Sequence, residues 1–208
     1  MHKNKELILQ AQRIRALAQT GLTYSSNEYD IERYTELLDI SNRITATVAD
    51  LEPEAIDNCY LLQKEYVTPK VDIRAVVFND KGEILLVRER LDGNWSLPGG
   101  WADVGYSPKE VVVKEVKEET GLDVSASRLL AVMDMSRHNH PSIPFYVYKF
   151  FILCEVTGGG FSEAFDILDK GFFDIHQLPE LSLERVLPEQ IRQMAELRGN
   201  GDRGVYLD

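Results

Sequence analysis

The chain has 208 residues, 44% hydrophobic and 27% charged, which is typical of a globular protein and excludes most disordered, collagenous and membrane classes. The net charge of -11 argues against nucleic acid or an anionic membrane as partner, and it favours a divalent cation as the carrier of any small anionic substrate. We expect a cytoplasmic protein, because the sequence shows no membrane span, no signal-peptide cleavage site and no disulfide or metal pattern for its two cysteines.

The first 66 residues are expected to be helical. Apolar residues recur at helical spacing between Leu7 and Ala18, and Gly21 is a typical helix stop. A second helical stripe runs from Ile31 to Val48 and ends before Pro53. This segment carries 7 basic and 11 acidic residues, which argues against a DNA-binding head. Dimerisation or closure of a substrate pocket is the function that we expect of it.

From Tyr66 onward the pattern changes to strands. Residues 71–78 are β-branched and partly alternating, residues 79–82 supply a turn, and residues 83–88 form the returning strand. Further strands are expected at residues 129–133, 145–155 and 171–173, and helices at 108–120 and 188–198. The mixture predicts an α/β domain at residues 67–208 behind a small helical domain at residues 1–66.

Strong local signals delimit the expected helix at residues 108–120. Ser107 is a favourable N-cap, Pro108 suits the first helical position, and Glu110 completes a capping box. Gly121 follows where a helix favours a left-handed residue. We therefore expect a loop, a helix of about three turns and a second loop.

Three carboxylates share one face of this helix, since Glu118 and Glu119 follow Glu115 by three and four residues. The valines on another face predict its buried side: Val112, Val113 and Val116. Like charges at this spacing cost about 0.2–0.5 kcal/mol per pair, and a hard cation such as Mg²⁺ or Mn²⁺ removes that cost. Taken alone, the run also fits a solvated acidic face with Lys114 and Lys117 as neighbours.

Gly99-Gly100 precedes the helix at a fixed interval and lets backbone approach a ligand closely. The whole segment resembles the signature of the Nudix hydrolases. Seven residues match it at the required spacing: Gly100, Glu115, Val116, Glu118, Glu119, Gly121 and Leu122. Tyr106 and Lys114 stand where the signature has Glu and Arg, so we expect Lys114 to donate to the Tyr106 hydroxyl in place of that ion pair.

The resemblance implies a mixed-sheet α/β/α sandwich and Mg²⁺-dependent cleavage, with Mn²⁺ as an alternative, of a nucleoside diphosphate linked to a group X. By the same resemblance, Glu115 and Glu119 bind the metal, with help from Glu118 and the Gly100 carbonyl. Glu115 or Glu118 orients or deprotonates the attacking water. Asp166, followed by Asp169, stands where some members carry a further metal ligand or base, and a simple polar loop is the alternative.

Four other residues are candidate substrate contacts. Arg74 and Arg88 lie on the first two strands and suit phosphate oxygens, although strand arginines are also common on surfaces. Trp95 and Tyr146 either stack on a substrate group or pack inside the protein.

The loop at residues 101–106 and the helical extension resemble the Nudix branch that includes CDP-choline and ADP-ribose pyrophosphatases. Hydrolysis of CDP-choline to CMP and phosphocholine is the first expectation, because aromatic faces hold a quaternary ammonium: Trp95, Tyr106, Phe145 and Tyr146. ADP-ribose is the alternative substrate. RNA end-processing and a non-catalytic nucleotide-sugar sensor are further alternatives, and a homodimer formed through residues 1–66 is the expected assembly.

Overall fold

The computed structural model describes residues 2–49, 67–103, 105–199 and 204–208. The chain divides into two compact units. One comprises residues 1–69 with the short segment 142–146, and the other comprises residues 70–141 and 147–208. None of the helices in the described ranges is long and apolar enough to cross a membrane.

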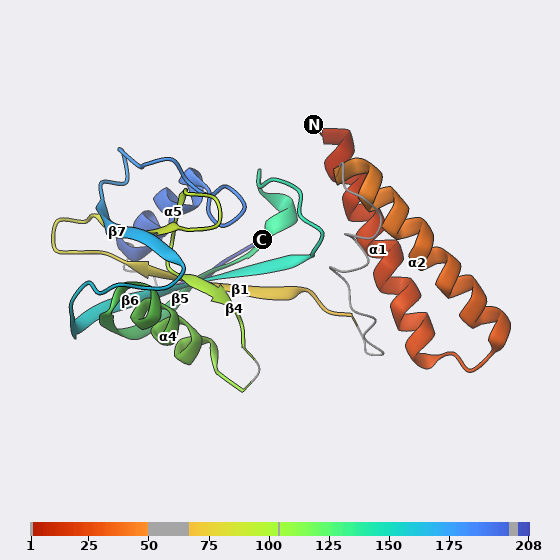
Figure 1. Ribbon diagram of the computed structural model, residues 1–208. Coiled ribbons are helices and arrows are strands. Elements are labelled where there is room, and N and C mark those ends of the chain that lie inside the picture. The colour runs from red at the N-terminus through yellow and green to blue at the C-terminus, as the bar shows by residue number, and fades with distance from the viewer. Residues whose placement is uncertain (1, 50–66, 104, 200–203) are drawn as a thin grey trace. The chain divides into compact units, whose positions relative to one another are not determined.

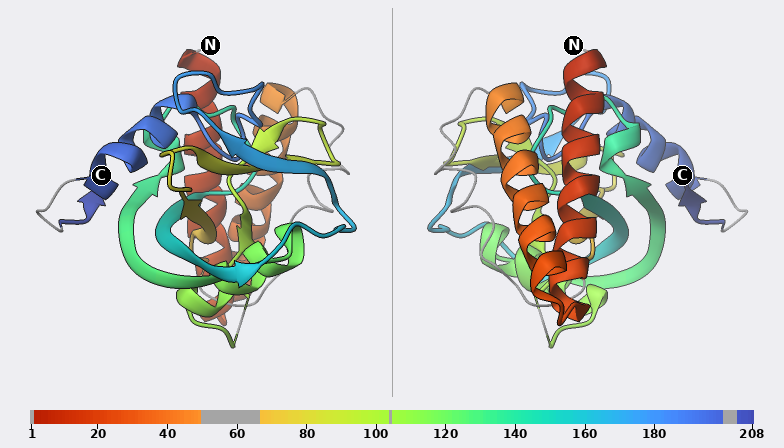
Figure 2. Two further views of the ribbon diagram at one scale, coloured as in Figure 1. Left: turned by 90° about the vertical axis from the view of Figure 1, so that its left-hand side faces the viewer. Right: turned by 90° about the vertical axis from the view of Figure 1, so that its right-hand side faces the viewer.

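In its described residues the first unit contains two helices, α1 (His2–Tyr24) and α2 (Glu28–Ala49), which lie side by side (Figure 2). The expected helical character is confirmed for residues 2–49, but Gly21 is not the stop. It lies inside α1, where a Cβ atom would fall 2.4 Å from the Tyr34 ring. Glycine therefore serves close helix packing here, and α1 continues for three further residues. Pro53 and Cys59 lie outside the described residues.

The second unit contains two sheets. The larger has the order β4-β1-β6-β5-β8 and mixes parallel pairs with antiparallel ones, and the smaller has the order β3-β2-β7. The strands are β1 (Lys70–Val77), β2 (Ile84–Glu89), β3 (Trp95–Ser96), β4 (Gly99–Trp101), β5 (Leu122–Asp134), β6 (Val147–Gly159), β7 (Ile167–Phe173) and β8 (Tyr206–Leu207). All five expected strands are present. The two- and three-residue strands β3, β4 and β8 were not predicted, because such short segments show no periodicity.

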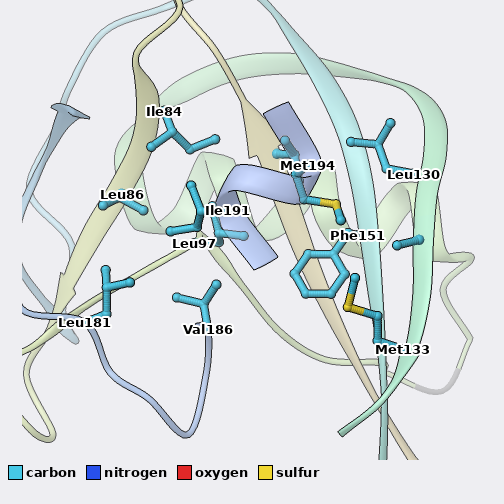
Figure 3. Packing of buried hydrophobic residues seen from close by; sticks show 12 residues of the cluster. Ile84, Leu86, Leu97, Leu130, Met133, Phe151, Leu181, Val186, Ile191 and Met194 are labelled. Carbon is cyan, nitrogen blue, oxygen red and sulfur yellow. The ribbon is translucent and has the colours of Figure 1, made fainter. Parts of the chain in front are cut away.

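Helices α4 (Pro108–Thr120) and α5 (Pro188–Gly199) cover opposite faces of the larger sheet (Figure 1). A short 3₁₀ turn, η1 (Met135–Arg137), follows β5. On the α5 side, Ile191 and Met194 pack with Phe151 and Met133 in a continuous apolar core (Figure 3). These layers confirm the expected α/β/α sandwich.

Strand β1 separates the two cores. Ile73, Ala75 and Val77 face α4, where they pack against Val111, Val112 and Val116. The intervening residues point to the other side of the sheet, since side chains alternate along a strand. Arg74 therefore lies on the face opposite to α4, beside the edge strand β4 with which β1 pairs.

Candidate active site

The local signals around α4 form as the sequence predicts. The Ser107 side chain accepts a hydrogen bond from the Glu110 N–H, and the Glu110 carboxylate accepts one from the Ser107 N–H at 2.8 Å. Gly121 has φ 85° and donates its N–H to the Lys117 carbonyl. These caps fix where the helix begins and ends, and so fix the angular positions of its three glutamates.

Glu119 is the buried member of the three. Its side chain is held by the backbone N–H of Gly99, 3.0 Å from Oε2, and the residue is 6% exposed. Burial raises its pKa to about 8; Glu89 and Glu115 act in the same direction, whereas Arg74 and the Gly99 N–H oppose the rise. A buried carboxylate of this kind favours either a proton or a cation.

Gly99 makes this contact possible. Its φ of 141° lies in a region that L side chains rarely adopt, and a Cβ atom there would fall 2.0 Å from the Ile73 carbonyl oxygen. The neighbouring Gly100 lies against Glu115, because a Cβ atom at Gly100 would be 3.4 Å from the Glu115 carboxyl carbon. The two glycines thus bring the loop backbone against both glutamates.

Glu115 is half-buried and Glu118 is exposed. Burial raises the pKa of Glu115, and the charge of Glu118 adds to the rise, while Lys114 opposes it. The three positions therefore differ in environment: Glu119 is buried, Glu115 is half-buried, and Glu118 is exposed beside Lys114.

Lys114 takes a different partner from the one expected. Its Nζ donates to Asp103 at 3.1 Å and lies 3.6 Å from Glu118 and 3.9 Å from Glu115. It stands 5.8 Å from the centroid of the Tyr106 ring, so it contacts the ring face as a cation–π pair. Asp103 therefore supplies the carboxylate that pairs with position 114, and it joins the loop to α4.

The donor chemistry fits a hard divalent cation. The three helix glutamates offer carboxylate oxygens and Gly100 offers a carbonyl oxygen, which are the ligand types that Mg²⁺ and Mn²⁺ prefer. Within the described ranges no three His, Cys, Asp or Glu side chains converge closely enough to hold a metal ion. Glu118 instead turns toward Lys114. A metal on this helix would therefore require the side chains of Glu118 and Glu115 to rotate away from Lys114.

A buried row of charges lies beside the glutamates and was not predicted beyond Arg74. Arg74 Nε donates to Asp72 Oδ1 at 2.9 Å, its Nη1 donates to the Leu97 carbonyl at 3.0 Å, and Lys149 also donates to Asp72. Burial acts to raise the pKa of Asp72, but the Arg74 and Lys149 charges outweigh it and hold that pKa below its usual value. The signal for these buried charges that the sequence offered was the interruption of an apolar strand by polar residues. The Arg74 guanidinium is buried and engaged by protein acceptors.

The remaining predicted residues lie in varied settings. Arg88 is exposed and donates to the Gly93 carbonyl, and Trp95 packs edge-on against Phe173 at 4.6 Å. Asp166 and Asp169 are exposed at the start of β7, and the hydrogen bonds that they make in the described part of the chain do not involve α4. Tyr146 is half-buried in the segment that belongs to the first unit.

Sequence reasoning also missed Glu89, at the end of β2. The residue is 8% exposed, its Oε1 accepts a hydrogen bond from Ser96 Oγ at 2.7 Å, and the same atom forms an ion pair with Arg185 Nε at 3.1 Å. The sequence showed only an ordinary polar residue at a strand end. Its partners come from β3 and from the loop before α5, which no local pattern connects.

Two family models match the chain. The first, described as a UDP-X-like N-terminal oligomerisation domain, matches residues 5–60, and the second, the NUDIX domain, matches residues 68–196. The second match covers more than half of the chain.

Relatives and solved structures agree with the family models. A Bacillus subtilis (strain 168) protein named "Putative ADP-ribose pyrophosphatase YjhB" is 43% identical over 95% of both chains. The crystal structure of a UDP-X diphosphatase is similar over 99% of both chains, with 38% identity and a TM-score of 0.64. An ADP-ribose pyrophosphatase from Streptococcus suis 89-1591 has 45% identity and a TM-score of 0.62, covering 68% of this chain and 100% of its own. With its glutamate helix and glycine loop in the arrangement described above, the chain belongs to the Nudix hydrolase family.

Proposed function

We propose that the protein hydrolyses the pyrophosphate bond of a nucleoside diphosphate linked to a group X, with Mg²⁺ or Mn²⁺ as cofactor. The observation that carries the proposal is the buried Glu119, fixed by the Gly99 N–H within a helix that also presents Glu115 and Glu118. A nucleoside monophosphate and X-phosphate are the products, because the oxygen of water bonds to one phosphorus as the bridging P–O bond breaks.

Each residue has a distinct part in this proposal. Glu115 and Glu119 would hold the metal with help from Glu118 and the Gly100 carbonyl. When bound, the metal neutralises the diphosphate and favours loss of a proton from water. Glu115 or Glu118 orients the attacking water and accepts its proton. Glu118 suits the second task, because its side chain is exposed to solvent. Position and charge neutralisation suffice for phosphoryl transfer, so no Ser, Cys or His nucleophile is required.

ADP-ribose is the substrate that we place first. The Bacillus and Streptococcus relatives carry that substrate in their names, and each is more than 40% identical to this chain. CDP-choline is the second candidate, from the resemblance of the loop at residues 101–106. Two aromatic faces that would hold its choline group are already engaged, since Trp95 packs against Phe173 and Lys114 lies over Tyr106.

A substrate panel tests the proposal. Release of monophosphate from ADP-ribose, CDP-choline and UDP-sugars is measured at one Mg²⁺ concentration, with EDTA as the blank. We expect metal-dependent turnover, the highest kcat/KM for ADP-ribose, and a loss of several orders of magnitude in Glu119→Gln. A higher kcat/KM for CDP-choline would reverse the order of substrates. Binding of these compounds without turnover would favour a sensor over an enzyme.

We also propose a homodimer in which the N-terminal helices form the interface. Support comes from the family model for residues 5–60, which is described as an oligomerisation domain. Leu17, Leu37 and Ile40 are exposed on α1 and α2, and apolar side chains on helices of this size favour a partner surface.

A further inference from the structure

Three charged side chains from three different elements form hydrogen bonds to one short segment, Ser96–Gly99. Glu89 accepts from the Ser96 hydroxyl at 2.7 Å, Arg74 donates to the Leu97 carbonyl at 3.0 Å, and Glu119 accepts from the Gly99 N–H at 3.0 Å. The Pro98 carbonyl in turn accepts from the backbone of β1 at 2.8 Å. Every residue of the segment that enters the glycine loop is thus held by a neighbouring element.

Glu89 lies on β2, outside the glutamate helix, and is paired with a residue of the loop before α5. Arg185 Nε is 3.1 Å from its Oε1, and the same guanidinium reaches Asp92 at 3.3 Å through Nη1. Arg185 also donates to Ser182 Oγ at 2.8 Å, which fixes it in the loop before α5. The carboxylate of Glu89 is therefore held by Ser96 and by a residue of the loop before α5, neither of which belongs to α4.

Charges of both signs lie close together in this region. Glu89 and Glu119 both act electrostatically on Arg74, and Glu89 also acts on Glu119. Asp72 is paired with both Arg74 and Lys149, and Glu89 is paired with Arg185. Among these buried carboxylates of the described chain, Glu119 is therefore the one held by a backbone N–H rather than by an ion pair. A buried carboxylate of this kind favours the approach of a cation, and the nearby negative charge of Glu89 adds to that preference.

We propose that Glu89 is a positioning residue of the active site, which holds the Ser96–Gly99 segment in register with α4 and supplies negative charge that draws a divalent cation to Glu119. The inference rests on the proposed metal site at Glu119. It assigns Glu89 no contact with the metal or substrate. Glu89 acts on the site in two ways: it holds the segment that ends at Gly99, and its negative charge attracts a cation. Residues that surround the direct ligands of a metal commonly act in this indirect way.

The test measures metal binding by the full-length protein without turnover. Mn²⁺ is titrated calorimetrically into EDTA-treated protein, and thermal unfolding is recorded for each variant. Glu89→Gln keeps the shape of the side chain and an acceptor for Ser96 but removes the charge. We expect its Mn²⁺ affinity to fall by about 10- to 100-fold.

Asp92→Asn is the matched control. Asp92 is the other carboxylate that pairs with Arg185, yet it makes no bond to the Ser96–Gly99 segment. Its variant should bind Mn²⁺ within about threefold of the wild type, since it loses a similar ion pair without touching the loop. Equal weakening in Glu89→Gln and Asp92→Asn, or no weakening in Glu89→Gln, would overturn the inference.

Two further variants keep the outcomes distinct. Ser96→Ala removes the donor to Glu89 while every charge remains, and we expect a smaller but measurable loss of Mn²⁺ affinity. Normal affinity in a folded Ser96→Ala would overturn the positioning part, even where Glu89→Gln fails to fold. Glu119→Gln should abolish binding. If it binds Mn²⁺ normally, the proposed metal site fails, whatever Glu89 does.

Discussion

The protonation of Glu119 should make the stability of the metal-free protein depend on pH. Burial raises the pKa of this carboxyl from 4.5 to about 8, so between those values the folded protein holds a proton that the unfolded chain has released. The stabilisation that this proton confers is complete below the unfolded-state pKa of 4.5. It is lost progressively as the pH rises from that value through about 8. Glu119→Gln removes the titration, while its amide oxygen can still accept from the Gly99 N–H.

The size of the effect follows from the two pKa values. A proton held only by the folded state changes the free energy of unfolding by about 1.4 kcal/mol per pH unit. Between about pH 6.5 and pH 8 the folded-state carboxyl passes from almost fully protonated to half protonated, so the wild type should lose roughly 1.5 kcal/mol. The Glu119→Gln variant should lose none of this amount. Glu118→Gln, which changes an exposed carboxylate on the same helix, should keep the wild-type slope.

Urea denaturation of EDTA-treated protein at several pH values in this window measures the three curves. Titrations elsewhere in the chain affect the wild type and both variants alike, so the difference between curves isolates Glu119. Parallel curves for the wild type and Glu119→Gln would refute the buried, proton-holding carboxyl. Saturating Mg²⁺ should stabilise the wild type and leave the unfolding of Glu119→Gln unchanged, because only a site in the folded state gains from the ligand.

Three further predictions concern the loop, the helix and the assembly. Gly99→Ala should cost more than about 3 kcal/mol in urea denaturation, since its Cβ would fall 2.0 Å from the Ile73 carbonyl oxygen; Gly105→Ala, also at positive φ but with no neighbour within 4 Å, should cost about 1 kcal/mol. Ser107→Ala should lower the free energy of unfolding by about 0.5–2 kcal/mol through loss of the α4 cap, and an unchanged value would contradict the capping box. Light scattering should show a dimer for the full chain and a monomer or aggregate for residues 67–208; a dimeric, fully active truncation would refute the N-terminal interface.

Helix α4 shows how much local sequence determines. Its cap, its first turn and its left-handed stop all depend on residues within a few positions of one another, so Ser107, Glu110 and Gly121 predict both ends as the structure has them. The shared face of the glutamates follows from helical spacing alone. The Nudix signature could be recognised from the sequence for the same reason, because its matching residues lie within one loop and one helix.

Contacts between distant segments depended on the tertiary structure. The ion pair of Lys149 with Asp72 joins residues 77 positions apart, and it forms because parallel pairing of β1 with β6 places the two side by side. Gly21 resembles a helix stop in sequence, yet it is the Tyr34 ring on α2 that requires its missing side chain.

The charges around the active site divide in the same way. The sequence placed three glutamates on one helix face, but the fold decided that Glu119 is buried, that Glu118 is exposed and that Lys114 pairs with Asp103. Only the packing of β2 against β3 and the loop before α5 brings Glu89 to Ser96 and Arg185. The position of a residue in the helix or strand repeat determines on which face of that element its side chain lies. Its burial and its partners depend on which other elements pack against that face.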